Sequence, residues 1–318
     1  MKKILSVISL ILLISFALSL SGCGRKYRSN DTTVIMKIGE NEITTDLFAY
    51  LYLSYMKDDP GLSSEKASEH AIAEIRKICA VDDMCREYKV KLSSDDKAAI
   101  QAEFDDLRAR FETDDEYYAE LDSYNMAEQV YFDLVTHYKY FEVLYYTVTD
   151  EFKGDIPADD ETVEKYIREN FLAAAQILIS KNGDDRTEEE SEALANDIKA
   201  KIDAGEDFFA LAKEYSEDED SASFTDGYYF VPGMMLDFFE EEVKALGIGE
   251  IGDVYESYLG YHIIYRLPLD EDYINSHFDS LRETYLAKIF NDRIDEKAAS
   301  YTVEYTDAYD AFIEAHKK

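Results

Sequence analysis

Two cysteines in the first third of the chain have a spacing that bears on disulfide and metal chemistry. Cys79 and Cys85 lie six positions apart. On one continuous helix this spacing is a rise of ~9 Å, which exceeds the usual Cα separation of a disulfide. A turn at 81–83 would bring the two thiols together, whereas an unbroken helix would keep them free, and we favour free thiols. Because no histidine lies nearby, a metal site is not expected here.

The third cysteine, Cys23, stands where an apolar N-terminal run ends. Two lysines precede the apolar residues 4–20, and a polar stretch follows the cysteine. This pattern is typical of a secretory signal. The motif Leu-Ser-Gly-Cys that ends at Cys23 resembles the bacterial lipobox, in which the leader is cut before a lipid-modified cysteine. We therefore expect a signal peptide at 1–22, lipid on Cys23 (diacylglyceryl and palmitate) and a tether at 23–33, with an uncleaved anchor as the alternative.

The net charge of the chain excludes several classes of partner. Its 318 residues include 33 basic and 69 acidic side chains, for a formal charge of −36. Such a surface repels nucleic-acid phosphates and anionic lipid headgroups, so we expect no nucleic-acid partner and no unassisted binding to membrane surfaces. Hydrophobic residues make up 46% of the chain, which predicts a folded protein, and the length favours two cores over one.

The region 34–169 has the apolar spacing of a mainly helical lobe. It opens with a short strand at 34–38 and a turn. Pro157 and the two aspartates after it mark a boundary before the last helix of this region, and after residue 268 the chain is helical again. Helices are expected at 45–59, 63–88, 94–111, 128–147 and 162–169.

From residue 170 the pattern changes to alternating strands and helices. Thr187 and Glu190 form a capping box that opens one helix, and Asp207 caps the next. A hairpin through Gly260 closes the segment. The expected elements are strands at 172–180, 228–230, 254–258 and 261–267 and helices at 187–204, 208–215 and 236–246. Their order is β-α-α-β-α-β-β.

This segment resembles the parvulin (PpiC) family of peptidyl-prolyl isomerases over about 171–268. Several separate motifs carry the resemblance in the right order. They are Ala-Gln-Ile-Leu-Ile at 175–179, the helix signature at 205–216, a degraded Gly-Asp-Leu-Gly at 225–227, Gly-Met-Met at 233–235 with Phe239, and Gly-Tyr-His-Ile-Ile at 260–264. The resemblance implies catalysis of rotation about X–Pro peptide bonds.

The resemblance also implies a set of site residues. Rotation about an X–Pro bond meets a barrier of ~18–20 kcal/mol and needs neither a nucleophile nor a metal nor another cofactor. It needs an apolar slot for the proline ring and surroundings that favour the twisted amide. The implied slot residues are Met235, Phe239 and Phe230, and the implied catalytic residues are His262, Asp218, Gln176 and Ser257. Without the resemblance, most of these residues would be taken as ordinary core residues, and Asp218 as a solvated acid in the acidic loop 217–226. The spacing of the acids in this loop is not that of a calcium-binding EF-hand.

One position departs from the family and leaves two functions open. Gln176 stands where the first strand of parvulins has histidine; it can hold His262 in one tautomer but cannot carry a proton. If this position only orients His262, the chain is an isomerase, with activity that Gln176 reduces or leaves intact. If a histidine is required, the chain is a catalytically weak or inactive parvulin-fold chaperone that holds unfolded exported proteins. A lipid-anchored solute-binding protein ranks last, because the long alternating β/α pattern is missing.

The loop after the first parvulin strand bounds the choice of substrate. Lys181 and Arg186 lie there among several acidic residues. A phosphoserine–proline substrate would need a cluster of basic residues, so that selectivity is not expected. The acidic field favours neutral or basic unfolded segments instead.

The flanks resemble the PrsA/SurA-type chaperone domain at 38–44 and 161–166. The implied protein is α+β. The C-terminal helical segment 269–318 is expected to pack on the helical chaperone lobe 34–169. The parvulin domain 170–268 is inserted between these two parts of the chain. The expected partners are unfolded or newly secreted proline-containing polypeptides and, through Cys23, the membrane; a homodimer stays open. The expected location is the extracytoplasmic face of the cell membrane, on a Gram-positive surface.

Overall fold

The computed structural model describes residues 31–150, 153–181, 186–218, 220 and 225–317. Its contacts divide the chain into two compact units. The four-stranded unit is Ala158–Lys288, and the helical unit combines the described residues up to Pro157 with Ile289 onward. The expected signal peptide and Cys23 lie outside the described residues. In the described part of the chain, no helix is long and apolar enough to cross a membrane.

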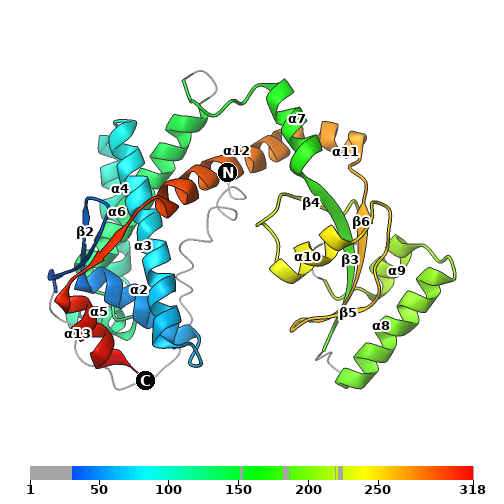
Figure 1. The fold of residues 1–318 in the computed structure, drawn as a ribbon, viewed down its shortest axis with the longest axis horizontal. Coiled ribbons are helices and arrows are strands. Elements are labelled where there is room, and N and C mark those ends of the chain that lie inside the picture. The colour runs from blue at the N-terminus through cyan, green and yellow to red at the C-terminus, as the bar shows by residue number, and fades with distance from the viewer. Residues whose placement is uncertain (1–30, 151–152, 182–185, 219, 221–224, 318) are drawn as a thin grey trace. The chain divides into compact units, whose positions relative to one another are not determined.

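The helical unit consists mainly of helices and also contains a small three-stranded sheet (Figure 1). Helix α12 has residues in both units. The elements are β1 (Val34–Ile38), β2 (Asn41–Thr44), α2 (Thr45–Asp58), α3 (Ser64–Glu87), α4 (Ser94–Arg108), α5 (Asp114–Ser123), α6 (Glu128–Thr149), α12 (Phe278–Ala299), β7 (Val303–Tyr305) and α13 (Asp307–His316).

The two ends of the chain share one core in the helical unit. Strand β1 pairs with β2 on one side and with β7 on the other, so the sheet order is β2-β1-β7. The rings of Phe48, Tyr52 and Phe312 pack against one another, with Phe312 at 5.3 and 5.4 Å from the other two. The C-terminal segment was expected to be helical throughout, and β7 corrects this. Three residues are too few for a periodic signal, and their partner strand lies more than 250 positions earlier.

Helix α3 carries both internal cysteines on one unbroken helix. Cys79 and Cys85 are free and buried, so the turn that would have joined them is not formed. Burial raises the pKa of each thiol to about 12. A thiol in such surroundings stays protonated and is a poor nucleophile, so both cysteines act as small core residues.

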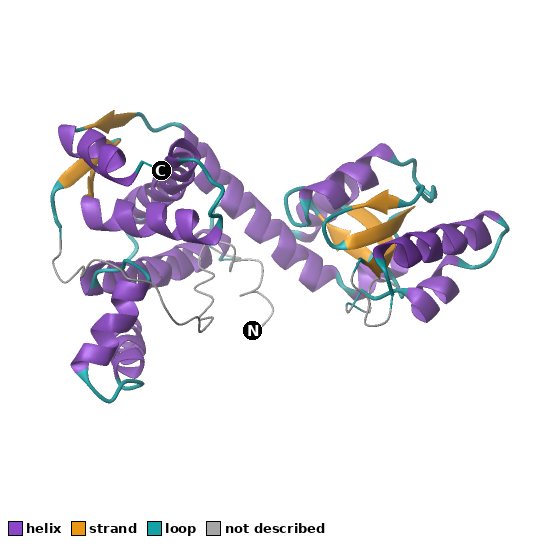
Figure 2. Cartoon of the chain, turned by 90° about the horizontal axis from the view of Figure 1, so that it is seen from below, coloured by secondary structure: helices purple, strands orange, loops and turns teal. Residues whose placement is uncertain are grey.

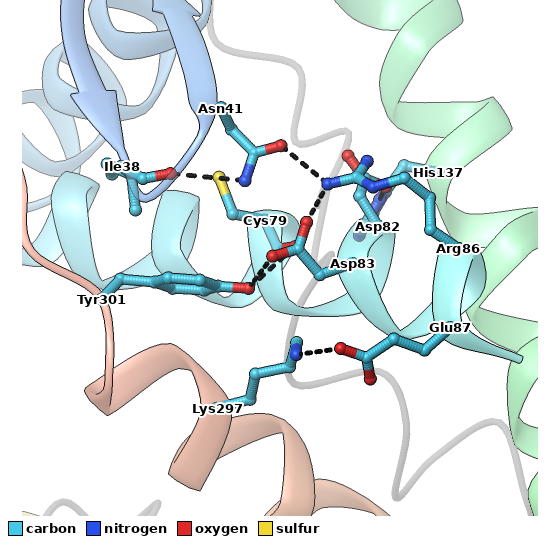
Figure 3. Close-up of polar contacts among 10 residues, drawn as sticks. All are labelled: Ile38, Asn41, Cys79, Asp82, Asp83, Arg86, Glu87, His137, Lys297 and Tyr301. Carbon is cyan, nitrogen blue, oxygen red and sulfur yellow. Dashed lines mark hydrogen bonds and ion pairs between the residues drawn. The ribbon is translucent and has the colours of Figure 1, made fainter.

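The polar face of α3 connects segments that are distant in the sequence (Figure 3). Tyr301 donates to Asp83 over 2.5 Å, and Lys297 pairs with Glu87 at 2.7 Å. Arg86 donates to Asn41 in the β1–β2 turn over 3.1 Å. We call these residues, together with the pair of Asp82 and His137, the α3 polar cluster.

The four-stranded unit contains an antiparallel sheet of order β4-β3-β6-β5. From β3 to β6 its element order β-α-α-β-α-β-β agrees with the order expected from the sequence, and the α+β fold class is confirmed. The elements are α7 (Asp160–Asn170), β3 (Leu172–Ser180), α8 (Glu188–Asp203), α9 (Phe208–Tyr215), β4 (Tyr228–Phe230), α10 (Asp237–Ala245), β5 (Tyr255–Glu256), β6 (Gly260–Leu267) and α11 (Glu271–Ser276). The unit extends beyond 170–268 at both ends, and the expected domain boundaries stay a prediction.

Helices lie on both faces of this sheet (Figure 2), and each face has its own hydrophobic core. Helices α8 and α9 pack on one face, against alternate residues of β3 and β6. Helix α10 packs on the other face. Gly227 brings the chain into β4 at a φ of +81°, and a Cβ there would lie 2.8 Å from the carbonyl oxygen of Ala174. Only glycine suits this position, so part of the degraded 225–227 motif has a structural reason.

Candidate functional site

Strand alternation puts two of the predicted site residues on the same face of the sheet. Ala175, Ile177 and Ile179 pack toward α8 and α9. Gln176 therefore belongs to the opposite face, which α10 covers. In the antiparallel register Leu178 lies opposite His262, so Gln176 and His262 are diagonal neighbours within side-chain reach.

His262 makes one hydrogen bond through each ring nitrogen. Ser257 Oγ lies 2.7 Å from Nε2, and Gln176 Oε1 lies 3.0 Å from Nδ1. Because the amide oxygen of Gln176 can only accept, Nδ1 carries the proton. Ser257 Oγ also accepts the N–H of Leu259 over 3.0 Å and keeps its hydroxyl hydrogen for an unprotonated Nε2. In the neutral ring these contacts select a single tautomer, with the proton on Nδ1.

The protonation state of His262 follows from its burial. The side chain is 1% exposed. Burial lowers the pKa of His262 to about 4, against an opposing effect of the Asp218 carboxylate. At neutral pH the imidazole carries no charge and has no ionisable proton to give to a substrate. In this arrangement it holds Ser257 and Gln176 through one hydrogen bond each.

Asp218 is held by two donors on one oxygen. Gln176 Nε2 donates to Asp218 Oδ2 over 2.6 Å, and the Tyr228 hydroxyl donates to the same oxygen over 2.7 Å. Burial, together with the hydrogen bond to Asp218, raises the pKa of Tyr228, so the phenol keeps its proton. A continuous chain of matched donors and acceptors thus runs from Ser257 through His262 to Tyr228. We call it the polar chain.

The three predicted slot residues lie in one hydrophobic cluster. Phe230 and Phe239 are 1% and 3% exposed, and their ring centroids are 5.9 Å apart. Met235 packs against this cluster and is half-buried. Because the two phenylalanines are enclosed, Met235 is the member of the three with substantial solvent exposure.

Two residues that the sequence analysis missed connect the polar chain to the apolar cluster. The Tyr228 ring lies 6.2 Å from that of Phe239, while its hydroxyl binds Asp218. Phe238 packs against the same cluster, and its ring centroid is 5.1 Å from that of His262. A signal for Tyr228 existed: it lies two positions before Phe230 on a strand, hence on the same face. The structure thus brings all seven predicted residues of the site into one region.

A buried acid that the sequence analysis also missed, Glu240, binds the backbone of the segment that precedes α10. Glu240 is 5% exposed, and its Oε1 accepts the backbone N–H groups of Gly233, Met234 and Met235 over 2.7, 3.0 and 3.0 Å. Burial alone would raise the pKa of Glu240, but the hydrogen bonds from Lys244 and from the backbone outweigh it and lower the pKa. Gly233 has a φ of +92°, which lets three successive N–H groups converge on one carboxylate. Glu240 therefore fixes the position of Met235.

The basic residues beside the first loop are both engaged by carboxylates. Arg186 pairs with Glu217, and Lys181 pairs with Glu188 and Glu256. The loop between them, 182–185, lies outside the described residues. In the part of the chain that the structure describes, no group of three or more His, Cys, Asp or Glu residues is arranged to hold a metal ion.

Comparison with known proteins found a family model that matches the segment containing the site. The model of the PPIC-type PPIase domain matches residues 162–266. This segment is similar to PPIC-type PPIase domains. The match covers the polar chain, the slot residues and Glu240, so the parvulin resemblance of this segment is confirmed.

Relatives of the PPIC-type domain include chaperones and foldases. The chaperone SurA of Chromohalobacter salexigens is 37% identical over 131 residues, which is 40% of this chain and 29% of that protein. The foldase protein PrsA of Geobacillus kaustophilus is 39% identical over 113 residues, which is 33% of this chain and 37% of that protein. The chain thus spans about a third of the length of these curated relatives. Among solved structures, the match to PrsA from Bacillus subtilis covers 85% of this chain and 91% of the PrsA chain. The sequence identity is 22% and the TM-score is 0.29.

Proposed function

We propose that the protein is a lipid-anchored extracytoplasmic foldase whose PPIC-type domain catalyses cis–trans isomerisation of X–Pro bonds in secreted proteins. One observation carries the proposal. The polar chain, with a neutral and singly oriented His262, lies against the apolar cluster of Phe230, Phe239 and Met235. An apolar surface beside fixed dipoles is what rotation of a prolyl amide requires.

The mechanism follows from what the amide loses as it twists. The planar amide is the more polar form, with negative charge on its carbonyl oxygen and double-bond character in its C–N bond. Met235 and the rings beneath it hold the proline while the preceding carbonyl turns. The Asp218 carboxylate, anchored by Gln176 and Tyr228, disfavours negative charge on that carbonyl and so favours the twisted form. Desolvation of the amide acts in the same direction.

Gln176 is compatible with this mechanism. The steps need no proton transfer, and burial keeps His262 neutral at physiological pH. An amide at position 176 supplies both contacts that are needed, an acceptor for His262 Nδ1 and a donor for Asp218. We therefore favour the active enzyme over a domain that only binds.

The test is an isomerisation assay on the full chain in detergent. The substrate is a proline tetrapeptide, and its isomerisation is monitored by protease coupling or by NMR exchange. We expect a rate above the uncatalysed rate that falls in His262→Ala. A rate equal to the uncatalysed one in both proteins would remove the enzymatic part of the proposal.

The alternative is a holdase without catalysis, which follows if isomerisation requires a histidine at position 176. Gln176→His distinguishes the two. A large gain in the isomerisation rate would mean that the natural site has reduced activity. An unchanged rate would mean that glutamine at this position is sufficient for catalysis. Suppression of client aggregation, measured on the same samples, shows whether chaperone activity survives in His262→Ala.

We also propose the domain division and the anchor. Residues 170–268 are the isomerase domain, and 34–169 with 269–318 form the chaperone lobe that holds unfolded chains. A leader at 1–22 directs export, and lipid on Cys23 holds the protein at the membrane through the tether to residue 33. Incorporation of labelled palmitate that is lost in Cys23→Ala supports the anchor, and incorporation that persists in this variant contradicts it.

A further inference from the structure

One edge of β3 is completed by a short segment instead of a strand. Strand β4 pairs with β3 over 172–174, whereas β6 pairs with it as far as Ser180. Among the described residues, no strand continues along the β4 side of β3 past residue 174. On that side the backbone groups of Leu178 and Ser180 bond to the segment 216–218, which follows α9. This segment ends at Asp218, the carboxylate of the proposed site.

Three hydrogen bonds join the segment 216–218 to β3. The N–H of Glu217 donates to the carbonyl oxygen of Leu178 over 2.8 Å. The N–H of Leu178 donates to Ser216 Oγ over 3.2 Å, and this oxygen also accepts the N–H of Asp218 over 3.3 Å. The N–H of Ser180 donates to Glu217 Oε2 over 2.8 Å. The Glu217 carboxylate thus supplies the acceptor that the backbone of a paired strand would otherwise provide.

The second oxygen of the Glu217 carboxylate is occupied by Arg186. The guanidinium donates to Glu217 Oε1 and forms an ion pair with it. Arg186 precedes Thr187, the N-cap of α8, so the cation is attached to a helix that packs in its own core. Burial alone would raise the pKa of Glu217, but the hydrogen bonds from Arg186 and Ser180 outweigh it and lower the pKa. The carboxylate is therefore ionised at neutral pH and is held at both oxygens.

We propose that Glu217 is a positioning residue that fixes Asp218 for isomerisation, with Arg186 as its support. This inference rests on the proposed function. Gln176 and Tyr228 hold Asp218 by its side chain, whereas Glu217 holds the backbone beside it. In the proposed mechanism the Asp218 carboxylate acts by its charge on the substrate carbonyl, and a displacement of ~1 Å in an active site can cost ~100-fold in rate. The pair of Glu217 and Arg186 therefore contributes to kcat through Asp218.

The kinetic test compares changes at Glu217 and Arg186 with a change at Glu214, an exposed acid three positions earlier. In Glu217→Ala we expect kcat for a proline tetrapeptide to fall roughly ten- to a hundredfold while KM changes less than about twofold, because the slot residues are unaltered. Glu217→Gln and Arg186→Met break the ion pair but keep an acceptor for Ser180, so their losses should be smaller and similar. Glu214→Ala should keep kcat. Equal kcat in Glu217→Ala and Glu214→Ala overturns the proposal.

A double substitution separates positioning from a general loss of folding. If Glu217 acts through Asp218, adding Glu217→Ala to Asp218→Asn should lower kcat by less than about twofold, because the carboxylate to be positioned is already gone. The same fold-loss with and without Asp218→Asn would show that Glu217 acts independently of Asp218, and the positioning role would then be wrong.

A measurement without catalysis keeps this test separate from the test of the proposed function. Gln176 Nε2 donates to Asp218 Oδ2 over 2.6 Å, so the NMR signals of the isotope-labelled Gln176 side-chain amide report the place of the carboxylate. Gln176→His assigns these signals by their loss. They should shift in Glu217→Ala and stay unchanged in Glu214→Ala, and a shift in a chain without isomerase activity removes the enzyme but supports the placement of Asp218 by Glu217. Unchanged signals in Glu217→Ala overturn the positioning role even in an active isomerase.

Discussion

The two compact units bury different polar residues, Asp46 and Ser68 in the helical unit and Ser191, Glu240 and His262 in the four-stranded unit. The four-stranded unit buries His262 and Glu240 and surrounds each with hydrogen-bond partners. The helical unit has a core of aromatic rings and free cysteines, and its α3 polar cluster includes strongly exposed members such as Glu87 and Arg86. Buried polar groups are costly unless every partner is present. Their concentration around Met235 and Asp218 indicates that the positions of these side chains matter for function.

The largest expected effect is on the stability of the helical unit. Phe48→Ala should lower the free energy of unfolding of this unit by about 3–5 kcal/mol, because it removes a fully buried ring that touches Tyr52, Tyr309 and Phe312. Denaturant titration measures this. Tyr146→Ala, at a 56% exposed position, is the matched control. A loss below about 1 kcal/mol would contradict the importance of the aromatic core.

The next effect is a dependence of stability on pH that comes from His262. Its pKa of about 4 in the folded chain is below its ordinary value of 6.5, so between these pH values the unfolded chain binds the extra proton. Stability is therefore constant above pH ~6.5 and falls as the pH drops to ~4, by about 3 kcal/mol for this group. Unfolding of the four-stranded unit at several pH values measures the slope. In His262→Asn the dependence of the unfolding free energy on pH between about 4 and 6.5 should be weaker. An unchanged dependence in this variant would contradict a buried neutral imidazole.

A smaller effect tests Glu240 as a positioning residue. Glu240→Gln keeps the shape but weakens three backbone hydrogen bonds and the pair with Lys244, at a cost of about 1.5–3 kcal/mol. Because these bonds hold Met235, we also expect KM for proline peptides to rise more than kcat falls. Glu241→Gln, one position on and exposed, is the control. Equal effects of the two substitutions on KM would show that Glu240 does not position the slot.

The smallest effect is expected in the α3 polar cluster. Lys297→Met breaks the pair with Glu87, whose side chain is 59% exposed. Solvent screens such pairs, so the change in unfolding free energy should stay below about 1 kcal/mol. Denaturant titration in low and high salt measures it. A loss above about 2 kcal/mol would mean that the helical unit relies on polar contacts as much as the four-stranded unit does.

Several elements could be predicted from local patterns alone. The strands β1, β3 and β4 begin and end where alternation and flanking turns predicted, and Asp207 caps α9 as expected. Helix α5 was missed because its ten residues contain many charges and a weak apolar stripe. Strand β7 was missed because β1, which pairs with it, is remote in the sequence. Glu240 was missed because one more acid in an acidic chain gives no local signal.

By itself the sequence determined the element order from β3 to β6, the negative charge and the family motifs, since these depend on residue type, periodicity and spacing. Tertiary structure decided which side chains meet. The register of β3 and β6 set Gln176 beside His262, burial made that histidine neutral, and the fold at Gly233 turned Glu240 into a ligand for three backbone N–H groups. Hydrogen bonds and desolvation depend on distance in space, which a linear pattern does not specify.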